Sequence, residues 1–206
     1  MALLVTVVGF DEKFAVRSFL RRGRTQVTEV LAVRPSRADP RSDRALNALK
    51  SLLEEASVPI SVMELDQLDF VSSVAKVAKW VRRSSHSEFV VNLSSGMRIV
   101  GLEVLAAFLL LNLDAEVEVE AEDFSGFTTW RTTDLLPTDM DPKTLELLRL
   151  VRQGLSVTEV ANRTRLSVTT AWRRLKRMEE ARLLWREGDK LSLTLKGEVY
   201  LAISEK

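Results

Sequence analysis

Short apolar runs alternate with helix-like stretches along the first half of the chain. Apolar runs of strand length lie at residues 2–8, 27–33, 60–65 and 88–93. Between them, apolar residues recur at three- and four-residue spacing, which is the period of a helix that buries one face. Strands that are apolar throughout and separated by helices are typical of a parallel sheet covered on both faces. The pattern predicts an α/β fold with a Rossmann-like, mostly parallel sheet.

A change of pattern marks the end of this sheet. Residues 116–122 alternate glutamate with valine or alanine, which predicts a half-exposed strand whose glutamates face water. A turn at 123–126 and a second strand over 127–133 would complete a terminal antiparallel hairpin. We therefore expect a first domain of residues 1–134, followed by a linker at 135–141.

The stretch from residue 97 to residue 111 is expected to form a helix that is apolar on nearly every side. A helix that covers a sheet in a monomer normally keeps a polar side toward water. Two explanations of this apolar surface are open. The helix is either completely buried within the domain or lies at a subunit interface. The extent of the apolar surface favours a contribution from an interface.

Residues 142–206 have the pattern of a small helical domain that ends in a hairpin. A first amphipathic helix ends near Gly154, and the capping box Ser156-Val157-Thr158-Glu159 opens a second. Ser167 caps a third helix, and two apolar runs then flank the turn Glu187-Gly188-Asp189. Three short helices followed by a two-stranded hairpin predict a winged helix-turn-helix domain.

Composition and charge narrow the class of protein. The chain has no cysteine, which excludes disulfides and thiol chemistry, and no uncharged apolar run long enough to cross a membrane. With no signal-like start, we expect a cytoplasmic protein. The net charge is only +1, but residues 141–206 hold 14 Lys and Arg against 9 Asp and Glu. A basic C-terminal third favours a nucleic acid partner.

The third helix of the second domain presents a basic face. We expect it to lie in the major groove of double-stranded DNA, with threonine and arginine toward base edges and further basic residues against phosphates. The candidate DNA-binding residues are Ser167, Thr169, Thr170, Arg173, Arg174, Arg177, Arg186 and Lys190. The alternative is that these arginines only solvate a winged helix that binds another protein.

The stretch Asn92-Leu93-Ser94-Ser95-Gly96-Met97-Arg98 follows the fourth predicted strand and opens a helix. Unpaired backbone N–H groups at a helix start attract anions, so the turn suits a phosphate-bearing ligand. The first strand ends at Gly9-Phe10-Asp11-Glu12 without the further glycines that NAD or FAD binding needs. The same serines and glycine could instead serve only to cap the helix.

This turn and the C-terminal winged helix together resemble the archaeal CRISPR-associated transcription regulators of the Csa type. Their sensor domain is called CARF, for CRISPR-associated Rossmann fold, and the resemblance covers essentially the whole chain. It implies a homodimer whose paired sensor domains bind a regulatory cyclic oligoadenylate, most often cyclic tetra-adenylate. The ligand-binding residues that it implies are Gly9, Phe10, Asp11, Asn92, Ser94, Ser95, Gly96, Met97 and Arg98.

The resemblance further implies a ligand-responsive regulator of CRISPR-Cas genes that binds CRISPR leader or cas promoter DNA, with no catalytic residue and no metal. Ser95 departs from the family, which often has a second glycine there. One alternative is a ring nuclease that cleaves the cyclic ligand, although the loop has no histidine or lysine to act as acid or base. Another alternative is an accessory DNA-binding protein without a sequence-specific target.

Overall fold

The first unit, residues Met1–Thr133, contains a six-stranded sheet in the order β3-β2-β1-β4-β5-β6. All neighbouring strands are parallel except β6, which is antiparallel to β5. A computed structural model that describes residues 1–37 and 39–204 confirms the predicted Rossmann-like sheet with its terminal hairpin. The strands are β1 (Ala2–Val7), β2 (Val27–Pro35), β3 (Ile60–Leu65), β4 (Glu88–Asn92), β5 (Glu116–Glu120) and β6 (Phe127–Arg131).

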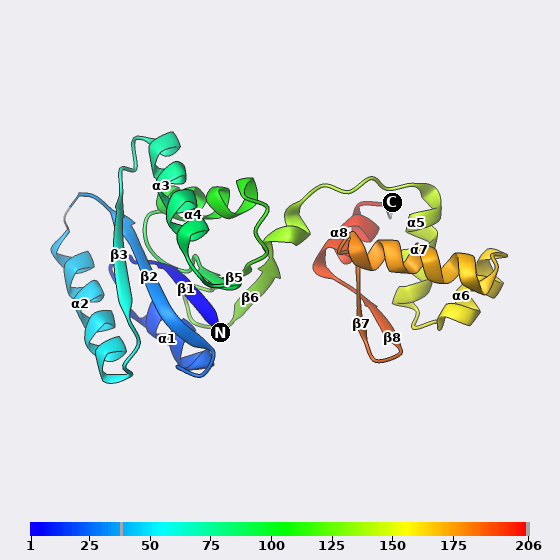
Figure 1. Cartoon of the computed structure of the whole chain (residues 1–206), viewed down its shortest axis with the longest axis horizontal. Helices are drawn as coiled ribbons and strands as arrows, with labels where there is room; N and C mark the ends of the chain where they lie inside the picture. Colours follow the sequence, from blue (N-terminus) through cyan, green and yellow to red (C-terminus); the bar gives the residue numbers. More distant parts are fainter. Residues whose placement is uncertain (38, 205–206) are drawn as a thin grey trace. The chain divides into compact units, whose positions relative to one another are not determined.

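Four helices cover the two faces of this sheet (Figure 1). Helices α1 (Lys13–Arg22) and α2 (Pro40–Glu55) pack on one face, and α3 (Phe70–Arg83) and α4 (Arg98–Leu110) pack on the other. The helices that connect β1 to β2 and β2 to β3 lie on one face of the sheet, and the helices after β3 and β4 lie on the other. The chain therefore extends the sheet in one direction from β1 and in the other direction from β4. The carboxyl ends of these two neighbouring strands form the topological switch point, where such sheets bind ligands.

The central strands are buried on both faces because alternate side chains point to opposite sides of the sheet. In β1, Leu4 packs with the helices α1 and α2, whereas Leu3 and Val5 pack with α3 and α4. All three side chains are fully buried. An uninterrupted apolar run is therefore the expected sequence of a central strand.

Two expectations about the end of the sheet changed. Two of the three glutamates of β5 do not face water: Glu118 is 0 % and Glu120 is 2 % exposed, because α1 lies over this face, whereas Glu116 is partly exposed. Helix α4 is not wholly covered within the first unit, because Leu102 and Leu110 are 56 % and 76 % exposed. The prediction of water-facing glutamates was wrong for Glu118 and Glu120 and correct for Glu122, which is exposed. Complete burial of α4 within this unit is excluded.

The second unit begins at Asp134 and has its own apolar core. Its capping box is present as predicted, since the Ser156 hydroxyl accepts from the Glu159 N–H and the Glu159 carboxylate accepts from the Ser156 N–H. The arrangement is that of the predicted winged helix-turn-helix. Its elements are α5 (Pro142–Arg152), α6 (Val157–Thr164), α7 (Val168–Glu180), β7 (Leu184–Glu187), β8 (Lys190–Leu193) and α8 (Leu195–Ser204).

Helix α8 is an element that sequence reasoning did not identify. The second of the two apolar runs that flank the hairpin turn extends to Leu195 in the sequence, but strand β8 ends at Leu193. There the Thr194 hydroxyl accepts from the Gly197 N–H and starts the helix. A Cβ atom on Gly197 would lie 2.2 Å from the Leu183 carbonyl oxygen, so glycine lets α8 pack closely against the chain before β7. None of the helices in the described ranges, 1–37 and 39–204, has the length and apolarity needed to cross a membrane.

Candidate functional site

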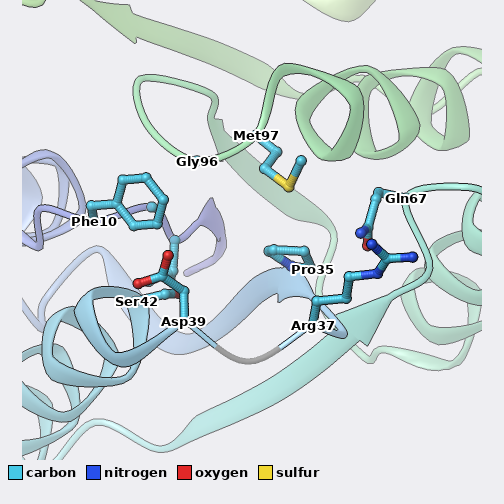
Figure 2. Close-up of a pocket in the computed structure, with 10 residues that line it drawn as sticks. Phe10, Pro35, Arg37, Asp39, Ser42, Gln67, Gly96 and Met97 are labelled. Atoms are coloured by element: carbon cyan, nitrogen blue, oxygen red, sulfur yellow. The ribbon is translucent and has the colours of Figure 1, made fainter.

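The strand ends of the first unit enclose a cavity of about 520 Å³ (Figure 2). It is lined by the loops that follow β1, β2, β3 and β4, at the carboxyl edge of the parallel strands. Its walls are formed by Val8, Gly9, Phe10, Pro35, Arg37, Asp39, Ser42, Gln67, Gly96 and Met97. Four of the residues expected to bind ligand therefore line it, which are Gly9, Phe10, Gly96 and Met97.

The loops after β1 and β4 meet through two glycines. A Cβ atom on Gly9 would lie 2.5 Å from the Gly96 nitrogen, and one on Gly96 would lie 2.4 Å from Val7 Cγ1. Gly96 also has a φ of 86°, which only glycine adopts without strain. The Ser95 hydroxyl donates to the Val7 carbonyl (2.8 Å) and accepts from the Gly9 N–H (3.2 Å). Ser95 thus ties the two loops together, which a second glycine could not do.

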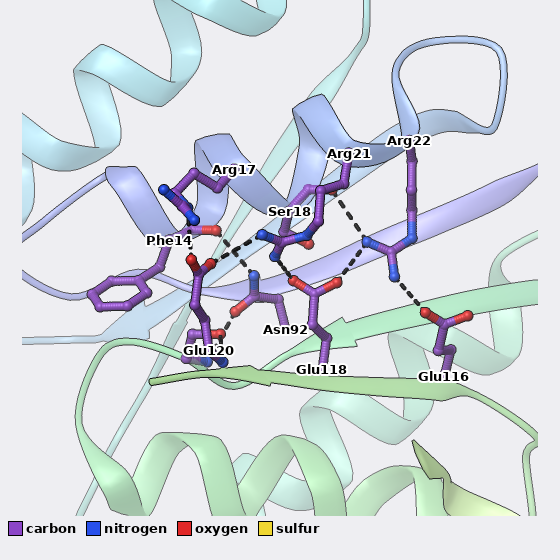
Figure 3. Close-up of polar contacts among 10 residues, drawn as sticks. Phe14, Arg17, Ser18, Arg21, Arg22, Asn92, Glu116, Glu118 and Glu120 are labelled. Carbon is purple, nitrogen blue, oxygen red and sulfur yellow. Dashed lines mark hydrogen bonds and ion pairs between the residues drawn. The ribbon is translucent and has the colours of Figure 1, made fainter. Parts of the chain in front are cut away.

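Asn92 and Ser94 hold neighbouring elements instead of lining the cavity (Figure 3). Asn92 is fully buried; its amide donates to the Phe14 carbonyl in α1 (3.1 Å) and its Oδ1 accepts from the Ser94 N–H (2.9 Å). The Ser94 hydroxyl accepts from the Glu120 N–H in β5 (2.9 Å). These two side chains therefore fix the β4–α4 turn against α1 and β5.

A ladder of ion pairs holds α1 over the same region (Figure 3). The glutamates of β5 lie on one face of the sheet, because alternate residues of a strand point the same way. Arginines on one side of α1 meet them, and Phe14 stacks on Phe124 with ring centroids 4.9 Å apart. The pairs are Arg17 with Glu120, Arg21 with Glu118 and Glu120, and Arg22 with Glu116 and Glu118.

The start of α4 is open at the cavity. Met97 is its N-cap residue and forms no side-chain capping hydrogen bond within the part of the chain that the structure describes. The first backbone N–H groups of α4 therefore keep their capacity to bind an anion. Arg98 is exposed in this first turn but lies outside the cavity wall. Asp11 also lies outside the wall; its carboxylate accepts from the Lys13 N–H at the start of α1 (2.9 Å).

Sequence reasoning missed the cavity residues supplied by the loops after β2 and β3 and by the first turn of α2. These are Arg37, Asp39, Ser42 and Gln67. The sequence contained a signal for these residues, because all parallel strands end at the same edge of a sheet. The residues after β2 and β3 therefore reach the same edge as those after β1 and β4. Hydrogen bonds from Arg41 keep the pKa of the Asp39 carboxyl below its usual value, so this carboxylate is charged at neutral pH. Arg37 brings a cation to the same wall. Among residues 1–37 and 39–204, no group of three or more His, Asp or Glu is placed to hold a metal ion.

A buried carboxyl lies beneath the loop that carries Gln67. Glu103 in α4 is 0 % exposed, and neither of its oxygens has a hydrogen-bond partner among the described residues. Burial, as the largest cause, together with the nearby carboxylates of Asp66 and Asp69 in the β3–α3 loop, raises the pKa of Glu103 to about 7. Between the unfolded value of 4.5 and about 7, the folded protein therefore holds a proton that the unfolded chain releases.

This proton predicts an unusual pH dependence of stability. Folding raises the pKa of this carboxyl from 4.5 to about 7. Its contribution to the free energy of unfolding is therefore fully present below pH 4.5 and is lost as the pH rises to about 7. We expect Glu103→Gln to raise the free energy of unfolding by about 2–3 kcal/mol at pH 8 and to change it little at pH 5. Urea denaturation at both pH values measures this difference. Equal effects of the substitution at pH 5 and pH 8 would contradict the prediction, and the exposed Glu122→Gln serves as the control.

The candidate DNA-binding residues of α7 fall into two groups. Thr169 and Arg173 are exposed on the side opposite the buried Ala171 and Leu175. Arg174 lies toward the unit's own body, with its guanidinium 3.9 Å from the Asp141 carboxylate. Only the first group is directed outward.

The remaining candidates have local partners or lie on the hairpin. Ser167 and Thr170 cap α7, since the Ser167 hydroxyl accepts from the Thr170 N–H (3.2 Å) and donates to its hydroxyl (2.8 Å). Arg177 lines the same groove as Arg174, next to the start of α5. Arg186 pairs with Glu179 (2.6 Å), while Lys190 is exposed at the hairpin turn.

Two further residues on the outward side of α7 were not among the candidates. Trp172 is 47 % exposed, and the Lys176 ammonium lies 5.3 Å from the centroid of its ring. Thr169, Trp172, Arg173 and Lys176 together form one exposed face, here called the α7 outer face. The hydrophobic spacing of α7 contained this information, because residues at i, i+3, i+4 and i+7 share a helix face.

Several solved structures resemble the chain at low sequence identity. Can2 from Sulfobacillus thermosulfidooxidans, in complex with cyclic tetra-adenylate, is 12% identical with a TM-score of 0.49, and the match covers 96% of this chain and 62% of that one. VC1899 from Vibrio cholerae is 13% identical with a TM-score of 0.46, covering 98% and 64%. A type III CRISPR defence DNA nuclease activated by cyclic oligoadenylate is 15% identical with a TM-score of 0.45, covering 87% and 30%. The chain therefore spans less than two thirds of each of these proteins.

Family models identify both units. The winged helix-turn-helix DNA-binding model matches residues 140–184. The model of the Csa3 CRISPR-associated Rossmann-like domain matches residues 2–131, which is more than half of the chain. No curated protein sequence matches. The chain belongs to the family of the Csa3 CRISPR-associated Rossmann-like domain, joined here to a winged helix-turn-helix, as its sequence motifs indicated.

Proposed function

We propose that this protein is a ligand-responsive transcriptional regulator of CRISPR-Cas genes. A cyclic oligoadenylate, cyclic tetra-adenylate in particular, binds at the strand-end cavity of a homodimer, and the winged helix binds CRISPR leader or cas promoter DNA. The observation that carries the ligand site is the cavity itself, which lies beside the open start of α4. The helix start offers N–H groups to phosphate, while the cavity offers apolar walls to the rest of the nucleotide.

The surface of α3 and α4 supports the homodimer. The two helices pack against each other and leave large apolar side chains in water. Val71 in the first turn of α3 and Leu68 in the loop just before it are each 77 % exposed, and Leu102 and Leu110 on α4 are exposed as well. Apolar surface of this kind is typical of a protein interface. Met97 lines the cavity and is 43 % exposed. A second copy of the chain that contacted Met97 would therefore lie close to the bound ligand.

The hydroxyl groups of the turn favour ligand sensing over ligand cleavage. A ring nuclease needs side chains that are free to position the ribose hydroxyl and to stabilise the transition state. Ser94 and Ser95 instead bind backbone groups of β5, β1 and the β1–α1 loop. The proposal is therefore a sensor without catalytic residues at this turn.

The α7 outer face supports binding to DNA. A threonine, an aromatic ring, an arginine and a lysine are exposed together on the helix that enters the major groove in winged helix-turn-helix domains. The exposed Lys190 on the hairpin is placed to contact phosphate. Arg174 and Arg177, which lie beside α5, are weaker candidates than the sequence suggested.

Charge reversal at Arg98 tests the proposed sensor. We expect Arg98→Glu to weaken the binding of cyclic tetra-adenylate by roughly 100-fold or more, because a carboxylate would face the ligand phosphates. Isothermal titration calorimetry measures the affinity. The matched control is Arg82→Glu in the last turn of α3, an exposed arginine at the opposite end of a helix from the cavity edge, which should bind like the wild type.

The same variants separate the two functions. Without ligand, Arg98→Glu should footprint the promoter DNA as the wild type does, because the substitution lies in the first unit. Unchanged affinity of Arg98→Glu for cyclic tetra-adenylate would refute the proposed phosphate site. A wild-type footprint that is the same with and without ligand would refute a ligand-responsive regulator.

A further inference from the structure

The start of α7 exposes two large apolar side chains. Val168, the first residue of the helix, is 49 % exposed, and Trp172, one turn later, is 47 % exposed. Residues four apart share a helix face, so these two side chains form one row, here called the α7 apolar stripe. The core of the unit is packed by the opposite side of the helix, where Ala171 and Leu175 are fully buried. The α7 apolar stripe is therefore free to contact a partner.

The charges around this stripe are positive. Thr169 and Arg173 form a second exposed row beside it, and Lys176 continues the stripe itself by one more turn. The first turn of α7 has no acidic residue, and its two glutamates, Glu179 and Glu180, are the last residues of the helix. The positive end of the helix dipole lies at the same end as the stripe. This charge favours a polyanion as the occupant, and double-stranded DNA is one.

Phosphate binding accounts for the cations of α7 but not for an exposed valine and tryptophan. The major groove of DNA presents hydrogen-bonding groups at the base edges and one apolar group, the methyl group of thymine. In helix-turn-helix proteins, the N-terminal residues of the second helix contact these edges. Val168 and Trp172 occupy that part of α7. Four residues rise about 6 Å along a helix, close to two base-pair steps of about 3.4 Å each, so the two side chains are spaced to contact nearby bases.

The indole of Trp172 already has a partner in the free protein. The Lys176 ammonium lies 5.3 Å from the centroid of the ring, which is a cation–π distance. This contact favours one orientation of the indole, with the ring held along the outer side of the helix. An ordered aromatic side chain loses less conformational entropy on binding than a mobile one.

We propose that Val168 and Trp172 select DNA by contacting thymine methyl groups in the major groove. The inference rests on the proposed function and adds the chemistry by which the winged helix distinguishes one DNA sequence from another. The DNA target then contains thymines at fixed positions opposite the α7 apolar stripe. The cations beside the stripe hold the DNA by charge.

Replacing single thymines by uracil tests this selection, because uracil lacks only the methyl group. A duplex that the full-length wild type selects from a random-sequence pool supplies the site, and each of its thymines is replaced in turn. Fluorescence anisotropy measures the affinities. We expect uracil to weaken wild-type binding about fourfold at the contacted positions, which is the effect of one buried methyl group, and to have no effect at the other positions.

Substitutions in the stripe assign the contacts. Trp172→Ala should weaken binding to the thymine duplex about tenfold and should no longer distinguish uracil from thymine at one contacted position. Val168→Ala should lose the distinction at another. The matched control is Val199→Ala in α8, a valine that is 47 % exposed, and it should behave like the wild type. Trp172→Ala should also keep the wild-type salt dependence, whereas loss of a phosphate contact in Lys190→Ala should flatten the slope by about one.

The outcomes separate this inference from the proposed function. Wild-type affinity that is insensitive to uracil at every position would overturn methyl selection and leave a DNA-binding regulator standing, and this scan needs no variant to fold. Equal losses of Trp172→Ala on thymine and uracil duplexes would make Trp172 a contact without selectivity and overturn its role. Unchanged DNA binding by Trp172→Ala and Val168→Ala would assign the stripe to a protein partner and overturn the inference. Failure of the wild type to enrich any sequence would overturn both proposals.

Discussion

Gly96→Ala is expected to lower the free energy of unfolding of the first unit by about 3–4 kcal/mol. The new Cβ atom would lie 2.4 Å from Val7 Cγ1 and 3.3 Å from the Val8 carbonyl oxygen, and neither neighbour can move without shifting β1. Alanine would also have to adopt a φ of 86°, which is unfavourable for any residue with a side chain. Both effects act on the turn that joins the loops after β1 and β4.

Gly23→Ala is the matched control for this substitution. Gly23 has a φ of 64°, but nothing lies within 4 Å of a Cβ atom built there. With ψ at 177°, this backbone conformation is one that essentially only glycine adopts, so Gly23→Ala should lose about 2 kcal/mol, the conformational part of the effect. Urea denaturation followed by far-UV circular dichroism measures both variants. Similar losses for Gly96→Ala and Gly23→Ala would show that the contact with Val7 is not tight, and would remove the argument that these two glycines set the shape of the cavity.

The double variant Arg21→Ala/Arg22→Ala should destabilise the first unit by about 4 kcal/mol at pH 8. Glu118 is fully buried, and these two arginines are the cations paired with it. Removing them leaves a buried carboxylate without compensation, which is far less favourable than removing the whole pair.

A triple variant supplies the control for this experiment. Adding Glu118→Leu to the double variant removes the buried charge, so we expect it to recover a large part of the lost stability. Urea denaturation at pH 8 compares the double and triple variants with the wild type. If the triple variant were less stable than the double variant, the loss would come from packing of the arginine side chains and not from an uncompensated charge.

The ion-pair ladder connects stability with the cavity. Helix α1 follows the loop that contains Gly9 and Phe10, and Asn92 joins the Phe14 carbonyl of α1 to the turn after β4. The arginines that anchor α1 on β5 therefore also set the position of one cavity wall. Loss of the ladder should consequently weaken ligand binding, even though none of its residues lines the cavity.

The side chains of the turn after β4 have different roles, and only some of these roles can be predicted from the sequence. The turn was identified from its position between a buried strand and an apolar helix, which are local patterns. Which of its side chains are free to face a ligand depends on contacts with elements that lie far away in the sequence. Asn92, Ser94 and Ser95 all carry groups that could bind phosphate, and all three are occupied by backbone groups of other elements.

The glutamates of β5 show the same limit. Alternation of Glu116, Glu118 and Glu120 with apolar residues correctly predicts a strand, because the period of two is a property of the backbone. It does not say what covers the polar face. That face is buried because α1, almost a hundred residues earlier, carries arginines at matching positions, and only the folded chain brings the two together.

The sequence by itself determined the order of strands and helices, the mostly parallel sheet, the winged helix-turn-helix and the family, because hydrophobic period, capping residues and turn motifs are written locally in the chain. The tertiary structure decided which loops share the cavity and which charges are buried together. Those features depend on contacts between residues far apart in sequence, such as Ser95 with Val7 and Gly9, and no local pattern encodes them.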